Sequence, residues 1–320
     1  MSQPDSETEK RPFDVLAVGG IDVDLVMKVE RLPGHGEKVM GEYVGHLPGG
    51  TVANFACAAA RLGLQVASLA TVGADEAGKL LVDDFQAYGV NTELIQVRED
   101  VASHFTVILI EPSGERSIVV VPMFKESYED EALERAIRKS HALYTMPNNA
   151  DLFGRMATIA RAHSVQVMID VEATIGADRK TLEAILGQVD IASFNEAGLV
   201  AISGEQPTVD GARRLLAYGP HTVVVTLGQD GSLAVTASEA AHVPAWQVAE
   251  VRDTTGAGDT FNAAFLAATL HGHPLQERLA FANAAAALAV TGLGPRGRLP
   301  ARQEVEQFMA GATLHAGESL

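Results

Sequence analysis

Short runs of aliphatic and β-branched residues alternate with longer helix-forming stretches along most of this chain. The runs occupy residues 15–18, 66–72, 142–145, 165–169, 191–194 and 222–226. Helices are expected over residues 50–62, 77–88, 129–140, 149–162, 179–187, 208–218, 258–270, 275–291 and 301–310. Strands that alternate with helices form a mostly parallel sheet with helices on both faces, so the pattern predicts a three-layer α/β domain. Ligands of such sheets bind at the carboxyl ends of the strands.

Two regions interrupt this alternation. Residues 38–46, 105–110 and 117–121 have the composition of strands, but no helix separates them. The Pro-Ser-Gly segment at residues 112–114 favours a hairpin turn between the last two of these strands. We therefore expect a small second β-sheet, formed from about residues 36–48 and 103–122, beside the main domain.

Length and composition favour one large domain. The 320 residues are 47% hydrophobic, and no Pro- or Ser-rich linker divides them. We expect one folded unit over residues 12–310, with tails at 1–11 and 311–320. The N-terminal tail is polar, lacks the apolar stretch of a signal peptide and is expected to be disordered. The single cysteine, Cys57, excludes an internal disulfide and, with this N-terminus, predicts a cytoplasmic protein.

The charge balance excludes two classes of partner. The net charge is −17, and lysines and arginines form no cluster along the chain. Nucleic acids and anionic membranes both require a positive surface, so neither is an expected partner. If the protein binds phosphate, it must do so through backbone amides and a divalent cation.

The segment DTTGAGD at residues 253–259, which leads into an apolar helix, carries the strongest chemical signal. Gly256 and Gly258 flank Ala257, so backbone N–H groups can converge without obstruction by Cβ atoms. The helix dipole adds partial positive charge at the same point, which suits a bound phosphate. Asp259 lies in the first helical turn, where we expect it to stay ionised and to take a proton from a hydroxyl. Helix stabilisation alone would explain Asp259 but not the two glycines.

This segment resembles the D-T-x-G-A-G-D signature of the ribokinase-like (PfkB) carbohydrate kinases, and it matches every fixed position of that signature. The resemblance extends from about residue 13 to about residue 310. It implies a ribokinase-like fold in which the small sheet is a lid over a sugar site. It also implies that Asp259 is the catalytic base, that Gly256, Ala257 and Gly258 form the anion hole, and that ATP and Mg²⁺ take part.

Candidate sugar ligands follow the first strand. Asp22 and Asp24 are suited to accept hydrogen bonds from sugar hydroxyls. The family has an aspartate at the position of Asp24, whereas many members carry asparagine at the position of Asp22. An acidic loop facing water is the alternative interpretation of both residues.

A second group of sugar ligands is expected where the helix at residues 50–62 begins. Gly49, Gly50 and Asn54 match the family's G-G-x-x-x-N signature, with glycines for close backbone approach and an amide for hydroxyl groups. A plain helix start would explain the glycines as well. Ribokinases generally carry lysine where Thr51 stands, which weakens the case for ribose itself.

The resemblance also assigns the nucleotide side of the site. Thr226, Gly228 and Gly231 form a T-x-G-x-x-G loop for phosphates, although a tight turn would have the same pattern. Asn283 lies in an alanine-rich helix that would line the adenine, where ordinary helix packing is the alternative. Asn195 and Glu196 complete the predicted ATP site.

Two cation sites follow from the resemblance. Asp253 and Thr255, with the loop at residues 291–297, would hold a monovalent cation such as K⁺. The family's N-x-x-E motif contributes a glutamate to the Mg²⁺ network, but Gly198 stands in its place here. Glu196 would then take over that contact through water.

The segment GADEAGKL at residues 73–80 nearly spells a P-loop. Leu80 stands where the hydroxyl residue that binds Mg²⁺ is required. Asp75 and Glu76 would also present negative charge to phosphates. We therefore exclude a P-loop.

The predicted function is ATP-dependent phosphorylation of a primary hydroxyl of a sugar or sugar derivative. A nucleoside kinase of the same family is the first alternative, and a catalytically silent sugar-binding regulator is the second. A NAD-dependent oxidoreductase would suit the fold, but residues 19–24 lack G-x-G-x-x-G. The resemblance also allows a homodimer formed through the lid.

Overall fold

The computed structural model describes residues 11–113, 115–172 and 179–312. The predicted tails fall almost entirely on residues outside these ranges. Among the described residues, no helix is both long enough and apolar enough to cross a membrane.

An eight-stranded sheet forms the centre of the molecule, in the order β14-β13-β12-β11-β10-β9-β1-β4. Its strands are β1 (Phe13–Val18), β4 (Val66–Leu69), β9 (Ser140–Thr145), β10 (Gln166–Val171), β11 (Ile191–Asn195), β12 (Thr222–Thr226), β13 (Ser232–Thr236) and β14 (Ala240–Val243). The six strands from β4 to β12 are parallel, and β13 and β14 add an antiparallel edge. The predicted three-layer α/β fold is confirmed.

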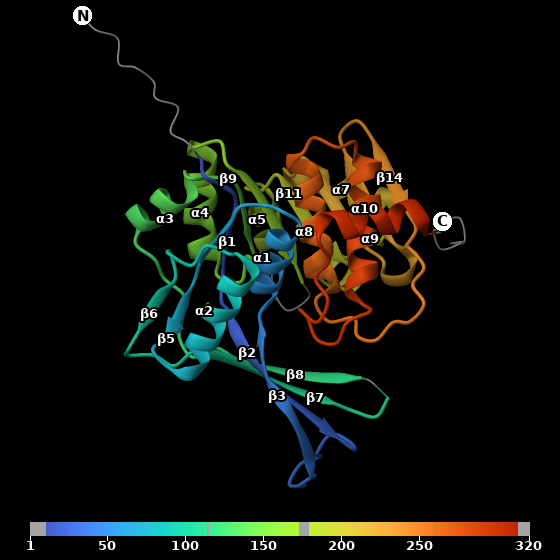
Figure 1. Ribbon diagram of the computed structural model, residues 1–320. Coiled ribbons are helices and arrows are strands. Elements are labelled where there is room, and N and C mark those ends of the chain that lie inside the picture. Colours follow the sequence, from blue (N-terminus) through green and yellow to red (C-terminus); the bar gives the residue numbers. More distant parts are fainter. Residues whose placement is uncertain (1–10, 114, 173–178, 313–320) are drawn as a thin grey trace, which may run out of the picture.

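Helices cover both faces of this sheet (Figure 1). On one face lie α1 (Thr51–Arg61), α2 (Glu76–Tyr88), α8 (Ala257–Leu270), α9 (Leu275–Ala289) and α10 (Arg302–Gly311). On the other lie α3 (Asp130–Ile137), α4 (Ala150–Ala162), α5 (Arg179–Leu186), α6 (Glu196–Ser203) and α7 (Val209–Leu215). Strand β1 shows why both faces of the sheet are covered by helices. Val15 and Ala17 pack into the core on one face, and Leu16 and Val18 pack into the core on the other. Of these elements, α6 was not predicted.

The parallel register brings the carboxyl ends of the strands to one edge. Val18 pairs with Thr145 and with Leu69, and Asn195 pairs with Thr226. The segments that follow these residues therefore meet at the same edge of the sheet, as the sequence predicted for its ligand-binding motifs.

The lid is a separate four-stranded sheet in the order β3-β2-β7-β8, which projects below the main body in Figure 1. It comprises β2 (Asp22–Val29), β3 (Gly41–Gly49), β7 (His104–Ile110) and β8 (Arg116–Val121). Strand β2 was missed, and Asp22 and Asp24 lie on it rather than in a loop. Its residues DVDLVMKV do alternate, but the two aspartates break the apolar pattern that marks a buried strand.

Smaller differences concern element ends. The strand expected at residues 66–72 is two strands, β4 and β5 (Thr71–Gly73), and β5 pairs with β6 (Gln96–Arg98). The helix expected at 208–218 ends as a 3₁₀ turn, η2 (Leu216–Tyr218). The helix expected at 129–140 stops at Ile137, because Ser140 already begins β9.

The rejected P-loop segment is a structural turn. Asp75 precedes α2, and its Oδ1 accepts hydrogen bonds from Gly78 N at 2.7 Å and from Ser103 Oγ at 2.7 Å. Its Oδ2 accepts from Ser103 N at 2.8 Å. Asp75 thus caps a helix and fixes the start of the lid strand β7, and its carboxylate occupies the position from which a P-loop would bind phosphate.

We predict that Asp75→Ala lowers the free energy of unfolding by about 2 kcal/mol, because it removes a helix cap and the partners of Ser103. Urea denaturation measures this change, and ATP affinity should stay as in the wild type. Asp83→Ala on the same helix is the control, since Asp83 forms an exposed pair with Lys79 and its loss should cost less than about 0.5 kcal/mol. A loss for Asp75→Ala as small as that of the control would contradict this account.

Candidate active site

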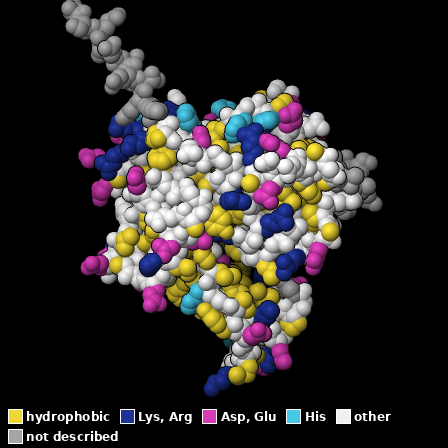
Figure 2. Space-filling model, in the orientation of Figure 1, with side chains coloured by type: hydrophobic (Ala, Val, Ile, Leu, Met, Phe, Trp, Pro, Cys, Tyr) yellow, Lys and Arg dark blue, Asp and Glu magenta, His cyan; other side chains and the backbone are white. Residues whose placement is uncertain are grey.

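A cleft of about 2310 Å³ separates the lid from the carboxyl edge of the main sheet. Figure 2 shows hydrophobic side chains gathered around the hollow between the main body and the projecting lid. A pocket for one small ligand usually has 300–1,000 Å³, so the cleft has room for two substrates. The predicted residues that line it are Asp22, Asp24, Gly50, Asn54, Asn195, Glu196, Thr226, Gly228, Gly231, Thr255, Gly256, Ala257, Gly258, Asp259 and Asn283.

The glycine-rich loop forms the start of α8. Gly256 has a φ of +74°, and a Cβ there would lie 2.6 Å from Pro295 O, so the turn requires glycine. A Cβ at Gly258 would meet no atom within 4 Å, which leaves open space over the first helical turn. In the described part of the chain, the amides of Gly258 and Asp259 donate to no acceptor. These free N–H groups at a helix N-terminus can bind an anion.

Asp259 is buried beside this loop, with its side chain in the cleft. Its Oδ2 accepts a hydrogen bond from Asn54 Nδ2 at 2.8 Å. Burial, with a smaller contribution from the charge of Glu172, raises the pKa of Asp259 to about 7, against the hydrogen bond from Asn54 and the charge of Arg296. Our expectation of a fully ionised carboxylate at neutral pH was therefore wrong, because desolvation exceeds the stabilisation from the helix start.

Asn54 connects Asp259 to an arginine that the sequence did not single out. Arg296 Nε donates to Asn54 Oδ1 at 3.0 Å, and Arg296 Nη2 donates to Gly49 O at 2.9 Å. Its third nitrogen pairs with Asp84, and the side chain is almost fully buried. Both ends of the Asn54 amide are thus engaged within the protein, which leaves one donor hydrogen and one lone pair for a sugar. No local pattern predicts this contact, because it joins residues 242 positions apart.

Asp22 and Asp24 lie together at the lid end of the cleft. Burial and the charge of Asp22 raise the pKa of Asp24 to about 7. Burial also raises the pKa of Asp22, against a hydrogen bond from Thr106 Oγ1 at 2.8 Å to its Oδ2. Asp22 Oδ1 is buried without a hydrogen-bond partner among the described residues. A buried acceptor of this kind requires a donor, and a sugar hydroxyl would supply one.

The two predicted glycines pack against these carboxylates. A Cβ at Gly49 would lie 2.4 Å from Asp24 Oδ2, so any side chain there would displace the carboxylate. Gly50 has a φ of +91° and precedes α1. The glycines therefore shape the acidic end of the cleft as well as opening it to a ligand.

An aromatic wall at the same end was not predicted. The rings of His104 and Phe124 stack with centroids 4.0 Å apart, and His104 Nδ1 accepts from Met123 N at 2.9 Å. Glu126 lies beside His104 and accepts a hydrogen bond from the Tyr128 hydroxyl. Flat apolar faces next to carboxylates suit the mixed surface of a sugar.

The predicted hydrogen bond from the Asn283 amide to adenine is not available. Asn283 Nδ2 donates to Val243 O at 2.8 Å and to Pro244 O at 3.2 Å, and Asn283 Oδ1 accepts from Ser232 Oγ at 2.8 Å. Both amide hydrogens are used to hold the turn after β14, so this residue has none to donate to adenine. Gly231 is required by packing, because a Cβ there would lie 2.1 Å from Val243 O.

Candidate Mg²⁺ ligands lie between the two ends. Asp170, Glu172 and Glu196 line the cleft. Burial, with the charges of Glu172 and Asp259, raises the pKa of Asp170 well above its ordinary value. Asn195 Oδ1 accepts from Gly198 N at 2.6 Å and so caps α6. Within the described ranges, no three His, Cys, Asp or Glu side chains form a metal cage, so Mg²⁺ here would need phosphate oxygens and water as further ligands.

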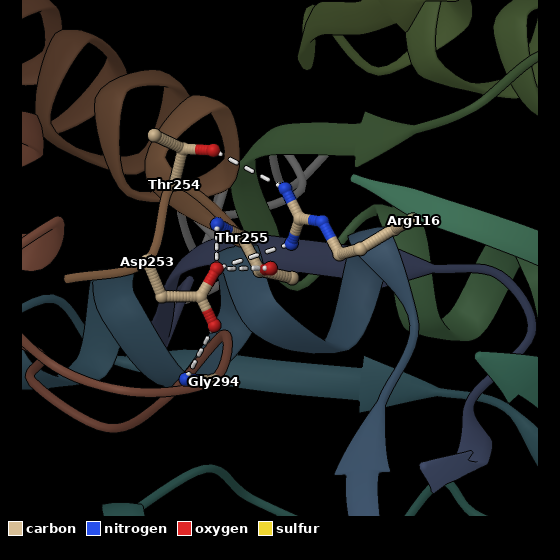
Figure 3. Close-up of polar contacts among 5 residues, drawn as sticks. All are labelled: Arg116, Asp253, Thr254, Thr255 and Gly294. Carbon is tan, nitrogen blue, oxygen red and sulfur yellow. Dashed lines mark hydrogen bonds and ion pairs between the residues drawn. The ribbon is translucent and has the colours of Figure 1, made fainter. Parts of the chain in front are cut away.

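Asp253 and Thr255 hold the loop before the anion site (Figure 3). Asp253 Oδ1 accepts from Thr255 N at 2.9 Å and from Thr255 Oγ1 at 2.6 Å, and Asp253 Oδ2 accepts from Gly294 N at 2.9 Å. Arg116 of the lid donates to Oδ1 as well. Partial burial would raise the pKa of Asp253, but these hydrogen bonds and the Arg116 charge together lower it.

Comparison with known proteins agrees with this geometry. The family model described as pfkB family carbohydrate kinase matches residues 13–302. A ribokinase of Bacillus subtilis (strain 168) is 30% identical over 301 residues, covering 93% of this chain and 99% of that protein. An ATP-dependent ribose-1-phosphate kinase of Halopiger xanaduensis is 28% identical, covering 92% and 98%. The structure of Arabidopsis thaliana ribokinase complexed with ribose and ATP has a TM-score of 0.83 at 27% identity, covering 93% and 98%.

The contact between Arg296 and Asn54 gives a pH prediction. A protonated Asp259 cannot accept a proton, so kcat/KM should fall as the pH drops below about 7. Because Arg296 lowers the pKa of Asp259, Arg296→Gln should move this acid limb to higher pH. The variant should also lose about 3 kcal/mol of stability, since it leaves the partly buried Asp84 unpaired.

A pH–rate profile and urea denaturation measure the two effects. Arg302→Gln is the matched control, because Arg302 forms an exposed pair with Glu306 on α10 and should change neither. An acid limb that stays in place in a folded Arg296→Gln variant would show that Arg296 does not act on Asp259.

Proposed function

The chain belongs to the pfkB family of carbohydrate kinases and is an ATP-dependent sugar kinase, and we propose that its acceptor is a neutral sugar of about pentose size. The observation that carries this proposal is the buried pair Asp22 and Asp24, in which Asp22 Oδ1 has no donor among the described residues. The pair lies in the same cleft as Asp259. One sugar can therefore be held by its hydroxyls and present another hydroxyl to the base.

In the proposed reaction, Asp259 accepts the proton of a primary hydroxyl as that oxygen attacks the γ-phosphorus of ATP. The bond between the γ-phosphorus and the β,γ-bridging oxygen breaks, and ADP leaves. The resemblance assigns the amides of Gly256, Ala257 and Gly258 to the equatorial oxygens of the transferring group. Ala257 N already donates to Thr254 O at 3.3 Å, so we assign this role chiefly to the amides of Gly258 and Asp259, which have no acceptor among the described residues. The catalytic effect comes from positioning and from fixed dipoles directed at developing negative charge.

The charges around the sugar end favour a neutral acceptor. Asp22, Asp24 and Asp259 contribute carboxyl groups there, while the guanidinium of Arg296 already bonds Asp84, Asn54 and Gly49. A phosphate on the acceptor would meet these like charges. Lys125 also lines the cleft, but its side chain is exposed, so water screens its charge. The Bacillus relative is a ribokinase and the Arabidopsis structure contains ribose, which supports a pentose. The ribose-1-phosphate kinase relative represents the opposite possibility, which these charges disfavour.

The carboxylates between the two ends fit a magnesium ion that arrives with ATP. Glu196, with Asp170 and Glu172, would contact its water ligands, since Mg²⁺ prefers oxygen ligands and keeps several waters. When bound, Mg²⁺ would neutralise part of the phosphate charge. A monovalent cation at Asp253 and Thr255 fits less well, because that carboxylate already accepts from Thr255, Gly294 and Arg116.

We further propose a single kinase domain over residues 12–310 that dimerises through its lid. Ile118 and Val120 of β8 line the cleft, whereas Val119 between them points to the opposite face of the sheet and is 56% exposed. Tyr43 and Val44 of the lid strand β3 are exposed as well. Apolar side chains on an open sheet favour a partner surface. The cytoplasmic location stays a prediction.

A screen for ADP release across neutral pentoses, neutral hexoses, sugar phosphates and nucleosides tests the choice of acceptor. We expect kcat/KM for the best neutral sugar to exceed that for its phosphorylated counterpart by 100-fold or more. This factor corresponds to about 2.7 kcal/mol, as expected when a charged group is brought close to buried carboxyl groups of the same sign. A nucleoside as the best acceptor would favour the nucleoside kinase alternative, and no turnover with any of them would favour a sugar-binding regulator.

Asp259→Asn tests the catalytic assignment. We expect kcat to fall by about 100-fold or more, while ATP and sugar affinities change little, because asparagine keeps the shape but cannot take a proton. Calorimetric titration supplies the affinities. A loss of less than about fivefold with the correct sugar would remove Asp259 from the role of base.

A further inference from the structure

Arg116 connects the lid to residues 253 and 254, which precede the glycine-rich loop. It is the first residue of β8, and its Nη1 donates to Asp253 Oδ1 at 3.1 Å while its Nη2 donates to Thr254 Oγ1 at 3.2 Å. Figure 3 shows its guanidinium directed at both residues. The two segments lie 137 positions apart in the chain. About a quarter of each charged side chain remains exposed, so the pair is partly shielded from water.

The partners of Asp253 leave no good place for a monovalent cation. The Asp253 carboxylate accepts four hydrogen bonds, from Thr255 N, Thr255 Oγ1, Gly294 N and Arg116 Nη1. A carboxylate has about four lone-pair sites, so these four hydrogen bonds leave none for K⁺. A second cation beside the guanidinium would also face like charge at short range. The residues therefore do not fit the monovalent cation that the sequence led us to expect.

We propose that Arg116 is a positioning residue that supplies, from the lid, the positive charge opposite Asp253, so that turnover does not require a monovalent cation. Thr254 and Thr255 run directly into Gly256, whose left-handed conformation starts α8. Fixing Asp253 and Thr254 thereby fixes the amides that follow. The inference rests on the proposed role of residues 256–258 in holding the transferred phosphoryl group.

The test compares wild type, Arg116→Gln and Arg116→Lys in KCl and in tetramethylammonium chloride at equal ionic strength. We expect wild-type kcat to change by less than twofold between the salts. In tetramethylammonium chloride, Arg116→Gln should lose at least tenfold in kcat with KM for ATP within threefold. Arg116→Lys should recover most of this loss, since it restores the charge.

A matched control and a binding readout accompany the rates. Arg31→Gln removes another lid arginine, which pairs with the exposed Glu37, and should behave as wild type in both salts. Trp246 is the single tryptophan and lines the cleft, so its fluorescence can report binding of a non-hydrolysable ATP analogue. The wild-type Kd should agree within twofold between the salts.

Three results would overturn the proposal. These are activation of the wild type by K⁺ of more than fivefold, a wild-type Kd that depends on K⁺ to that extent, or a folded Arg116→Gln variant with wild-type kcat. Failure of Arg116→Lys to recover activity would overturn the assignment of charge as the active property. Asp259→Asn separates this inference from the proposed function, because an active Asp259→Asn would refute the base without altering the salt dependence.

Discussion

The hydrogen bond between Asn54 and Asp259 is the contact on which the site depends. It joins α1 to α8, two helices from opposite ends of the chain that pack on the same face of the sheet. Arg296 orients the other end of the Asn54 amide and is itself held by Asp84. The carboxylate is thus placed by a chain of buried polar contacts, each with its partner satisfied, and this removes the reorientation that a solvated base would undergo during the reaction.

Burial gives the same carboxylate its chemical character. An exposed aspartate would be a weak base near pH 7, whereas Asp259 has a pKa of about 7 and so can both hold and release a proton in that range. Asp24 shares this property at the other side of the sugar position. The protonation states of Asp24 and Asp259 consequently respond to a ligand, because a ligand that donates hydrogen bonds to these groups favours their ionised forms.

Local patterns predicted most of the fold and about half of the site. Apolar runs and glycine signatures identified the parallel strands of the main sheet, every α-helix except α6, the lid hairpin and the loop around Asp259, because each depends on neighbours in sequence. Strand β2 escaped because Asp22 and Asp24 interrupt the apolar run that marks a buried strand. Arg116, His104 and Arg296 escaped because their roles arise from contacts between distant segments, and a lone arginine in a loop has no pattern of its own. The use of both Asn283 amide hydrogens likewise depends on the turn after β14.

The placement of Asp22 and Asp24 on a lid strand has a consequence for the order of events. These carboxylates belong to the lid, whereas Asp259 belongs to the body, so a sugar bound to all three would cross-link the two parts. Part of the binding energy of the sugar is then available to draw the lid down. If ATP binds first, no sugar yet links Asp22 and Asp24 of the lid to Asp259 of the body. We expect such a molecule to favour sugar before nucleotide and to waste little ATP on water, because the acceptor itself completes the enclosure.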